Sequence, residues 1–164
     1  MKTRRIFSIL LTLAMALGML ALMPVTASAA STLTAGNAAE LTAALSSAAS
    51  GDTIKLTADI TYDTWINIGQ AITFDLNGFT LNATAGLRVW GKVLLADHTN
   101  GEFNVSSTSR SFCIDTYGND PKIEVTNVTT ATAEYAVYGN AGEIIVYGDV
   151  KQEKAGAAAA DCGV

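Results

Sequence analysis

The chain has 164 residues, of which 49% are hydrophobic and 15% charged, and its 10 Lys+Arg against 15 Asp+Glu give a formal net charge of −5. This acidic balance is not interrupted by a basic stretch, so we expect no nucleic-acid partner, because a polyanion is repelled. The length is sufficient for one domain with a substantial core.

The first 29 residues have the layout of a bacterial signal peptide. A basic start precedes an uncharged apolar run over residues 6–23, and Ala27-Ser28-Ala29 supplies the small residues that signal peptidase requires. The run could span a bilayer, so a retained anchor is the alternative, but no basic cluster follows it. We therefore expect a signal peptide at 1–29, secretion or cell-surface display, and no membrane contact after cleavage. The mature chain keeps 7 basic and 15 acidic residues, a net charge of −8.

Residues 30–50 are predicted to contain one short helix. Asn37 and Glu40 have the spacing of a capping box, and Gly51 is expected to end the helix in the left-handed conformation. About three turns of helix are unstable alone in water, so the apolar stripe must cover an apolar surface. The stripe consists of Leu41, Ala44, Leu45 and Ala48.

From residue 51 onward the chain contains only short strand-like segments between turn residues. In the first of them, Ile54 and Leu56 alternate with polar residues, as in a half-buried strand. No second amphipathic helix is visible. The later segments are 71–81, 87–91, 92–97, 101–105, 111–118, 122–128, 135–139 and 143–150.

Two kinds of strand ending recur along these segments. One is a large side chain followed by Gly, at Trp90, Tyr117, Tyr138 and, more weakly, Cys162. The other is an Asn or Asp after an apolar strand. Its members are Asn77, Asp97, Asn127 and Asp149.

These strand endings recur with a loose period of about two dozen residues. Such a period predicts a parallel β-helix with two or three strands per turn, because like side chains stack on successive rungs. An antiparallel sandwich or jelly roll is the alternative, but it favours tight hairpin turns. The helix then covers the apolar interior of the first rung together with its unpaired backbone groups. Residues 51–164 would form four to five rungs that are truncated or open at the C-terminal end, where self-association or stacking is a candidate interaction.

The segment AAELTAALSSAASGDTIKLTADI (38–60) resembles the opening of pectin-lyase-like parallel β-helix proteins, in which a Leu-x-x-Ala-Leu helix precedes Gly-Asp-Thr-Ile-x-Leu. ITFDLNGFTL (72–81) resembles a second rung of the same group, secreted bacterial proteins among them. The resemblance implies a right-handed parallel β-helix with an N-terminal α-helical cap. It implies no single function, since the family includes lyases, hydrolases, adhesins and tail spikes. The expected structural positions are Leu41, Leu45, Gly51, Asp52, Ile54, Leu56, Asn77 and Gly78.

The sequence offers little support for catalysis. Lyases of this fold use clustered acids that bind Ca²⁺, and no such cluster stands in any rung, so we assign no catalytic residue, metal or cofactor. Asp97 and His98 are adjacent, but neighbours in a strand face opposite sides, so we interpret them as a turn residue and an exposed side chain. The Asn/Asp column is interpreted as a ladder of turns rather than a metal site. Cys113 and Cys162 are expected to be free, buried thiols, with a disulfide as the alternative.

Trp90, Tyr117 and Tyr138 are the candidate ligand-binding residues. Strand alternation favours an outward orientation, in which stacked rings form a strip for sugar rings and Asp115 bonds their hydroxyls. An inward orientation would make them ordinary core residues. We expect a secreted or cell-surface module without catalysis that serves adhesion or binds a polysaccharide such as a cell-wall glycan. The alternatives are a fragment or small member of the polysaccharide lyase and glycoside hydrolase group, and a purely structural piece of a surface protein.

Overall fold

A computed structural model of the chain describes residues 29–107, 112–131 and 135–152. Three sequence predictions therefore lie outside the described residues: the signal peptide except for Ala29, the state of Cys162, and the end of the chain over 153–164. Within the described part of the chain, no helix combines the length and the apolar character needed to cross a membrane.

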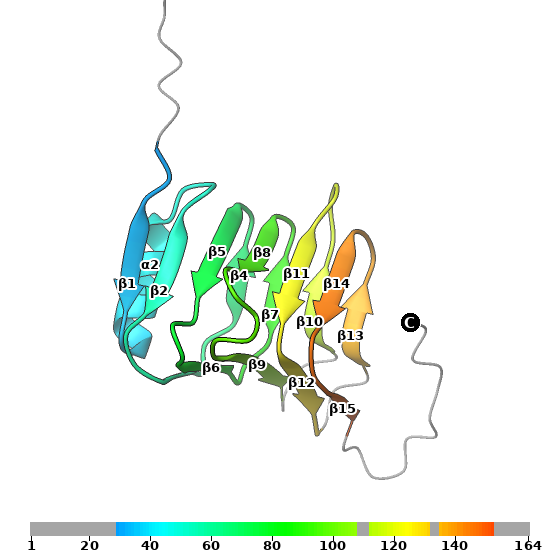
Figure 1. The fold of residues 1–164 in the computed structure, drawn as a ribbon. Coiled ribbons are helices and arrows are strands. Elements are labelled where there is room, and N and C mark those ends of the chain that lie inside the picture. Colours follow the sequence, from blue (N-terminus) through cyan, green and yellow to red (C-terminus); the bar gives the residue numbers. More distant parts are fainter. Residues whose placement is uncertain (1–28, 108–111, 132–134, 153–164) are drawn as a thin grey trace, which may run out of the picture.

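The described residues form a parallel β-helix of about five turns with one short helix, α2 (Ala38–Ser47), at its N-terminal end (Figure 1). Three parallel sheets make its walls, here called sheets A, B and C. Sheet A contains β1 (Thr32–Ala35), β2 (Thr53–Leu56), β5 (Ala71–Asp75), β8 (Lys92–Leu95), β11 (Lys122–Val125) and β14 (Glu143–Val146). Sheet B contains β3 (Ile60–Tyr62), β6 (Thr80–Ala83), β9 (Glu102–Ser107), β12 (Asn127–Thr130) and β15 (Val150–Gln152). Sheet C contains β4 (Ile66–Ile68), β7 (Leu87–Val89), β10 (Phe112–Thr116) and β13 (Tyr135–Gly139).

All strand pairings within these sheets are parallel, which confirms the predicted coil and excludes the sandwich. Each turn contributes one strand to each wall, so a full turn has three strands. The predicted strand-like segment 71–81 contains two strands, because the chain turns a corner between β5 and β6. The prediction also missed β3 and β4, which are only three residues long and give little alternation to detect.

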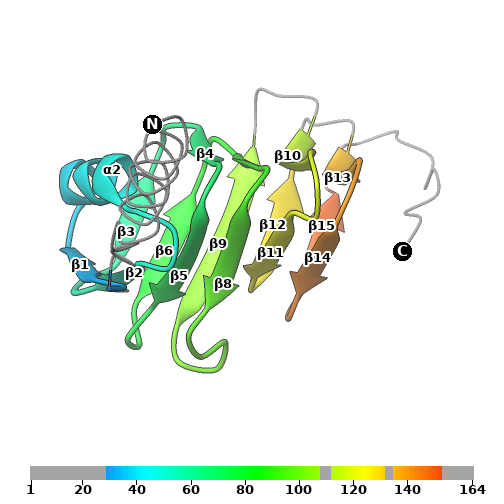
Figure 2. The same ribbon diagram turned by 90° about the horizontal axis from the view of Figure 1, so that it is seen from above.

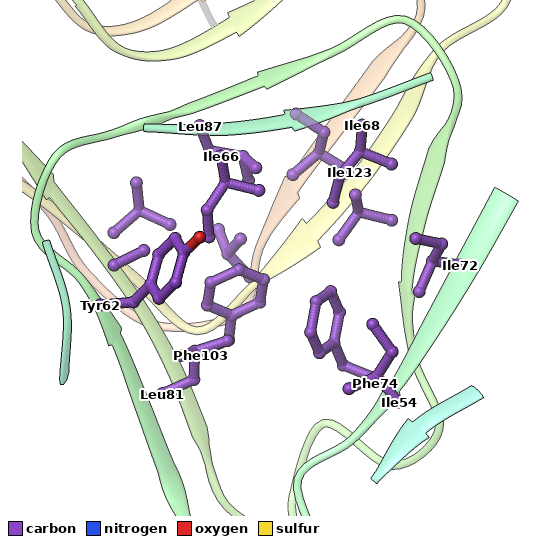
Figure 3. Close-up of a cluster of buried hydrophobic side chains, with 14 of the residues drawn as sticks. Ile54, Tyr62, Ile66, Ile68, Ile72, Phe74, Leu81, Leu87, Phe103 and Ile123 are labelled. Carbon is purple, nitrogen blue, oxygen red and sulfur yellow. The ribbon is translucent and has the colours of Figure 1, made fainter. Parts of the chain in front are cut away.

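The core lies inside the three walls, where inward side chains stack from rung to rung. In sheet B, Ile60, Leu81 and Phe103 are in register, and the ring of Phe103 lies 5.2 Å from that of Phe74 in sheet A. Figure 3 shows Leu81, Phe103 and Phe74 pointing from the walls toward a common interior, with Ile54 beside Phe74. The predicted inward orientation of Ile54 and Leu56 is confirmed, because period-2 alternation places every second residue of β2 in the core.

The N-terminal end is covered as predicted, with one difference. Leu41 and Ala44 of α2 are buried, and Leu45 and Ala48 pack against the core, so the apolar stripe is confirmed. Figure 2 shows α2 at this end of the coil. The helix, however, does not cover the unpaired edge of β2. That edge is paired by β1, a strand formed by residues that were assigned only to an N-terminal segment.

The ends of the helix show how its sequence works locally. Asn37 Oδ1 accepts the N–H of Glu40 at 2.9 Å, and Glu40 Oε2 accepts the N–H of Gly36 at 2.8 Å, so the capping box is present with its return bond one residue earlier. The helix ends at Ser47, and Ala48 is already extended. The prediction that Gly51 ends the helix is therefore wrong: Gly51, with φ 97°, forms the tight turn into β2.

Asp52 fastens this end of the molecule. Its carboxylate is almost completely buried and accepts the N–H of Ser31 at 2.8 Å and that of Ala49 at 2.8 Å. These two backbone bonds are the main reason why the pKa of Asp52 lies below its ordinary value. One side chain thus joins the approach to β1, the exit of α2 and the start of β2.

Candidate ligand-binding face

The outer surface of sheet C has an ion pair at its centre. Register places Arg88 of β7 between Asn67 of β4 and Asp115 of β10, all in outward positions. Arg88 Nε donates to Asp115 Oδ2 at 2.7 Å. Asp115 is only 6% exposed, so it lies at the bottom of this surface and holds the guanidinium in place.

Both tryptophans of the chain belong to this surface, and each lies across a glycine of a neighbouring rung. A Cβ added to Gly69 would come within 2.2 Å of Trp90 Nε1, and one added to Gly86 within 2.3 Å of Trp65 Cζ3. The indole rings therefore occupy the space that a side chain would otherwise fill. Such a seat holds a ring close to the sheet, and Trp90 is still 40% exposed.

Further aromatic rings extend the surface on either side of the ion pair. Trp90 and Tyr117 are 5.5 Å apart with an interplanar angle of 37°, and Phe112 and Tyr138 are 5.7 Å apart at 21°. Tyr135 adds a ring 5.9 Å from Tyr138. We call this surface the aromatic face. It consists of Trp65, Trp90, Phe112, Tyr117, Tyr135 and Tyr138, with Arg88 and Asp115 between them.

Arg88 connects the two groups of rings. Its guanidinium carbon lies 5.7 Å from the ring centroids of Trp65, Phe112 and Tyr117, within the range of cation–π attraction. One cation is therefore shared by three rings and one buried carboxylate. This arrangement fixes the rings around it, because moving any of them exposes a paired charge.

The outward orientation predicted for these aromatic side chains agrees with the structure, whereas their predicted stacking in one column does not. Trp90, Tyr117 and Tyr138 all face outward and are 40% to 44% exposed, as strand alternation indicated. They do not form one column. Tyr138 is in register with Asp115, two residues before Tyr117, because the spacing along the chain differs from one rung to the next.

Four members of the site were not among the candidates: Trp65, Arg88, Phe112 and Tyr135. Trp65 precedes β4, a missed strand whose three residues are too few to mark Trp65 as an outward aromatic residue. Arg88 shares the outward phase of β7 with Trp90, but nothing along the sequence pairs it with Asp115. Phe112 and Tyr135 begin their strands, where alternation gives no reliable orientation.

The Asn/Asp column is also split by the structure. Asn77 and Asp97 belong to separate turns, whereas Asn127 and Asp149 lie opposite each other on the outside of sheet B. The ladder on sheet B also includes Asn82 and Asn104: Asn104 follows Asn82 by 22 residues, and Asn127 follows Asn104 by 23. Asn104 Nδ2 donates to Asn82 Oδ1 at 3.2 Å, Asn127 Nδ2 to Asn104 Oδ1 at 2.8 Å, and the Asp149 N–H to Asn127 Oδ1 at 2.9 Å.

A groove of about 380 Å³ runs over this ladder, lined in part by Asn104, Asn127, Asp149 and Lys151. The amides in it already bond one another from rung to rung. We therefore interpret the ladder as a structural feature that satisfies side chains along the coil.

Asp97 and His98 form no acid–base pair of the usual geometry. Asp97 Oδ1 accepts the hydroxyl and the N–H of Thr99, and these bonds hold the pKa of Asp97 below its ordinary value. His98 instead stacks on Tyr147, with ring centroids 4.0 Å apart. The interpretation of Asp97 as a turn residue and of His98 as an exposed side chain is confirmed.

Acidic side chains of the walls are mostly paired with cations. Within the ranges that the structure describes, no three His, Cys, Asp or Glu side chains gather as a metal site would require. Cys113 is a buried free thiol whose pKa is raised by burial. The ion pairs, besides Arg88–Asp115, are Lys55–Asp75, Lys92–Asp120, Lys122–Glu124, Lys122–Glu143 and Lys151–Asp149.

Comparison of the chain with family models, with curated proteins and with solved structures finds no match in any of the three. Function is therefore inferred from the geometry of the aromatic face.

Proposed function

We propose that this protein is a secreted or cell-surface β-helix module that binds carbohydrate through its aromatic face and carries out no catalysis. Adhesion to a polysaccharide, such as a cell-wall glycan, is the role that such binding would serve. The resemblance of the first rungs to pectin-lyase-like proteins and the signal-like residues 1–29 support the extracellular setting.

The observation that carries this proposal is the group of exposed rings on sheet C. Aromatic side chains present flat apolar faces, and the C–H faces of pyranose rings pack against them. Trp90, Tyr117 and Tyr138 each leave at least 40% of their surface in solvent, although large aromatic residues normally contribute most when buried. Exposed apolar patches of this kind mark interaction sites.

The two tryptophans make the proposal directly testable. Because both Trp65 and Trp90 lie on the aromatic face, all of the tryptophan fluorescence of the chain reports on that face. Titration with neutral and acidic oligosaccharides is expected to shift or quench this fluorescence. A complete lack of response with every plant and cell-wall glycan tested, together with no binding by calorimetry, would contradict the proposal.

A matched pair of tyrosine variants separates this face from the rest of the surface. Tyr117 on sheet C and Tyr147 beside β14 are 40% and 41% exposed. We expect Tyr117→Ala to weaken glycan binding about fivefold, the effect of losing about 1 kcal/mol of ring contact, and Tyr147→Ala to leave it unchanged. Equal losses in both variants would mean that the bound surface is not the aromatic face.

The enzymatic alternative has its own assay. A small polysaccharide lyase would release unsaturated uronate from pectate in the presence of Ca²⁺, which ultraviolet absorbance detects. We expect no product. Product that disappears in Asp97→Asn or Asp115→Asn would overturn the proposal of a non-catalytic module.

A further inference from the structure

The charges of the aromatic face neutralise each other. Among the described residues in the strands of sheet C, the charged ones are Arg88 and Asp115, and their side chains are 35% and 9% exposed. The short Nε–Oδ2 bond of 2.7 Å makes them a close ion pair. The centre of the face therefore carries no net charge.

Three aromatic rings also lie close to Arg88. Trp65, Phe112 and Tyr117 surround the guanidinium at equal distances of 5.7 Å. The hydrogen bond to Asp115 uses Nε of Arg88, so a ligand carboxylate that approaches the Nη groups also comes close to the negative charge of Asp115. Repulsion between the two carboxylates then offsets the attraction of the guanidinium.

The negative net charge of the chain also disfavours an anionic ligand. The chain has a formal net charge of −5 at pH 7, so the molecule as a whole repels a polyanion. From the paired centre and the acidic surroundings we infer that the aromatic face is specific for neutral glycans and discriminates against polyuronates. This inference rests on the proposed function, since it names the ligand class of the same site.

The face offers a neutral sugar what it needs. The rings accept the flat C–H faces of pyranoses, and Asn67 lies exposed beside them with its Oδ1 held by Trp65 Nε1 at 3.0 Å. That bond leaves the amide N–H₂ of Asn67 directed away from Trp65, where it can donate to sugar hydroxyls. Apolar stacking and neutral hydrogen bonds are only weakly sensitive to salt, unlike the attraction of a polyanion to a free cation.

The test compares polygalacturonate with its fully methyl-esterified form, which has the same backbone without the charge, and with a neutral β-linked glucan. Isothermal titration calorimetry on the mature chain is expected to show binding of the esterified polymer or the glucan at least about tenfold tighter than that of polygalacturonate, the ratio expected from unfavourable charge contacts. The affinity for the neutral polymers should change little between low and high salt.

Charge variants supply the second readout. Asp115→Asn removes the anion that neutralises Arg88, so we expect it to raise the affinity for polygalacturonate several-fold in a salt-dependent manner. Asp149→Asn makes the same change of net charge on sheet B and should have no such effect. Circular dichroism and thermal unfolding verify that both variants are folded.

The outcomes separate the two proposals. Binding of none of the three polymers contradicts the proposed function. Tighter binding of polygalacturonate than of its ester by the wild-type chain contradicts only the inferred preference, and so does an equal response of Asp115→Asn and Asp149→Asn.

Discussion

The two ends of the coil are finished differently. At the N-terminal end, β1 pairs with β2, and α2 lies beside them (Figure 1). Leu41 of α2 is completely buried. At the other end, β13, β14 and β15 are the last strands of their sheets in the described part of the chain. Val150 continues the inward column of Val105 and Val128, yet it is 49% exposed, whereas Val128 is 0% exposed.

This difference shows that an inward orientation does not bury a side chain by itself. In a parallel coil, a core residue is covered by the rungs above and below it as much as by the opposite walls. Val128 has a neighbouring rung on each side, and Val150 has one on a single side among the described residues. Stability should therefore respond strongly to mutations at the covered end and weakly at the other.

The largest effect is expected for Leu41→Ala. Leu41 is fully buried beneath α2, so its truncation removes apolar contacts and leaves a cavity, at a cost of about 2–5 kcal/mol in the free energy of unfolding. Leu45→Ala, on the same helix but only partly buried, should cost clearly less. Denaturant unfolding measures both. A Leu41 effect below that of Leu45 would show that α2 does not cover the core.

A smaller effect is expected for the matched pair Val128→Ala and Val150→Ala. Both valines occupy the same inward column, and only their cover differs. Val128→Ala should lower the free energy of unfolding by about 2 kcal/mol and Val150→Ala by less than about 0.5 kcal/mol. Equal effects would mean that the last rung is covered in solution as well as the fourth.

Two aspartates, Asp52 and Asp149, should make stability at the two ends of the coil respond differently to pH and salt. The pKa of Asp52 is lowered by backbone hydrogen bonds, and that of Asp149 by its ion pair with Lys151. A carboxyl pKa that is lower in the folded than in the unfolded chain stabilises the fold above the ordinary value near 3.8, and this contribution disappears as the pH falls through the folded pKa.

We therefore expect Asp52→Asn to lower the melting temperature by several degrees at pH 7, with the difference from wild type shrinking below about pH 4. The loss should persist in 1 M salt, because hydrogen bonds to buried backbone groups are little screened. Asp149→Asn should have a small effect that high salt abolishes, since the pair is exposed. Differential scanning calorimetry at several pH values and salt concentrations measures both variants.

The weakest effect is expected in self-association. The unpaired edges of β13, β14 and β15 in the described part of the chain can template pairing with a second molecule. Light scattering at increasing concentration should show weak association that Val150→Lys reduces and Thr61→Lys, at the covered end, does not. A monomer at every concentration would exclude this interaction.

Much of the fold could be predicted because its determinants are local. Alternation within Thr53–Leu56 identifies Ile54 and Leu56 as inward residues, and the stripe at Leu41 identifies a helix that needs cover. β1 could not be predicted in this way. Of its four residues only Leu33 and Ala35 are apolar, which is too short a pattern to predict a strand. The strand forms because β2 offers a free edge.

The candidate site was predictable only in part. Alternation placed Trp90 and Tyr117 on the outside, and their rings do lie together. It could not pair Arg88 with Asp115, 27 residues later, because that contact depends on the register between two rungs. The packing of Trp90 on Gly69 and of Trp65 on Gly86 could not be predicted either, because it depends on which ring the neighbouring rung brings over each glycine.

Local sequence patterns are enough to predict that the chain coils into parallel rungs with an apolar interior and a helix at one end. Period-2 alternation, the capping box and the recurring strand ends are properties of neighbouring residues, so they can be read along the chain. Which outward residues meet depends on the packing of one rung on the next. Successive rungs differ in length, and the register between them is set by how inward side chains stack, which places Tyr138 beside Asp115 rather than above Tyr117.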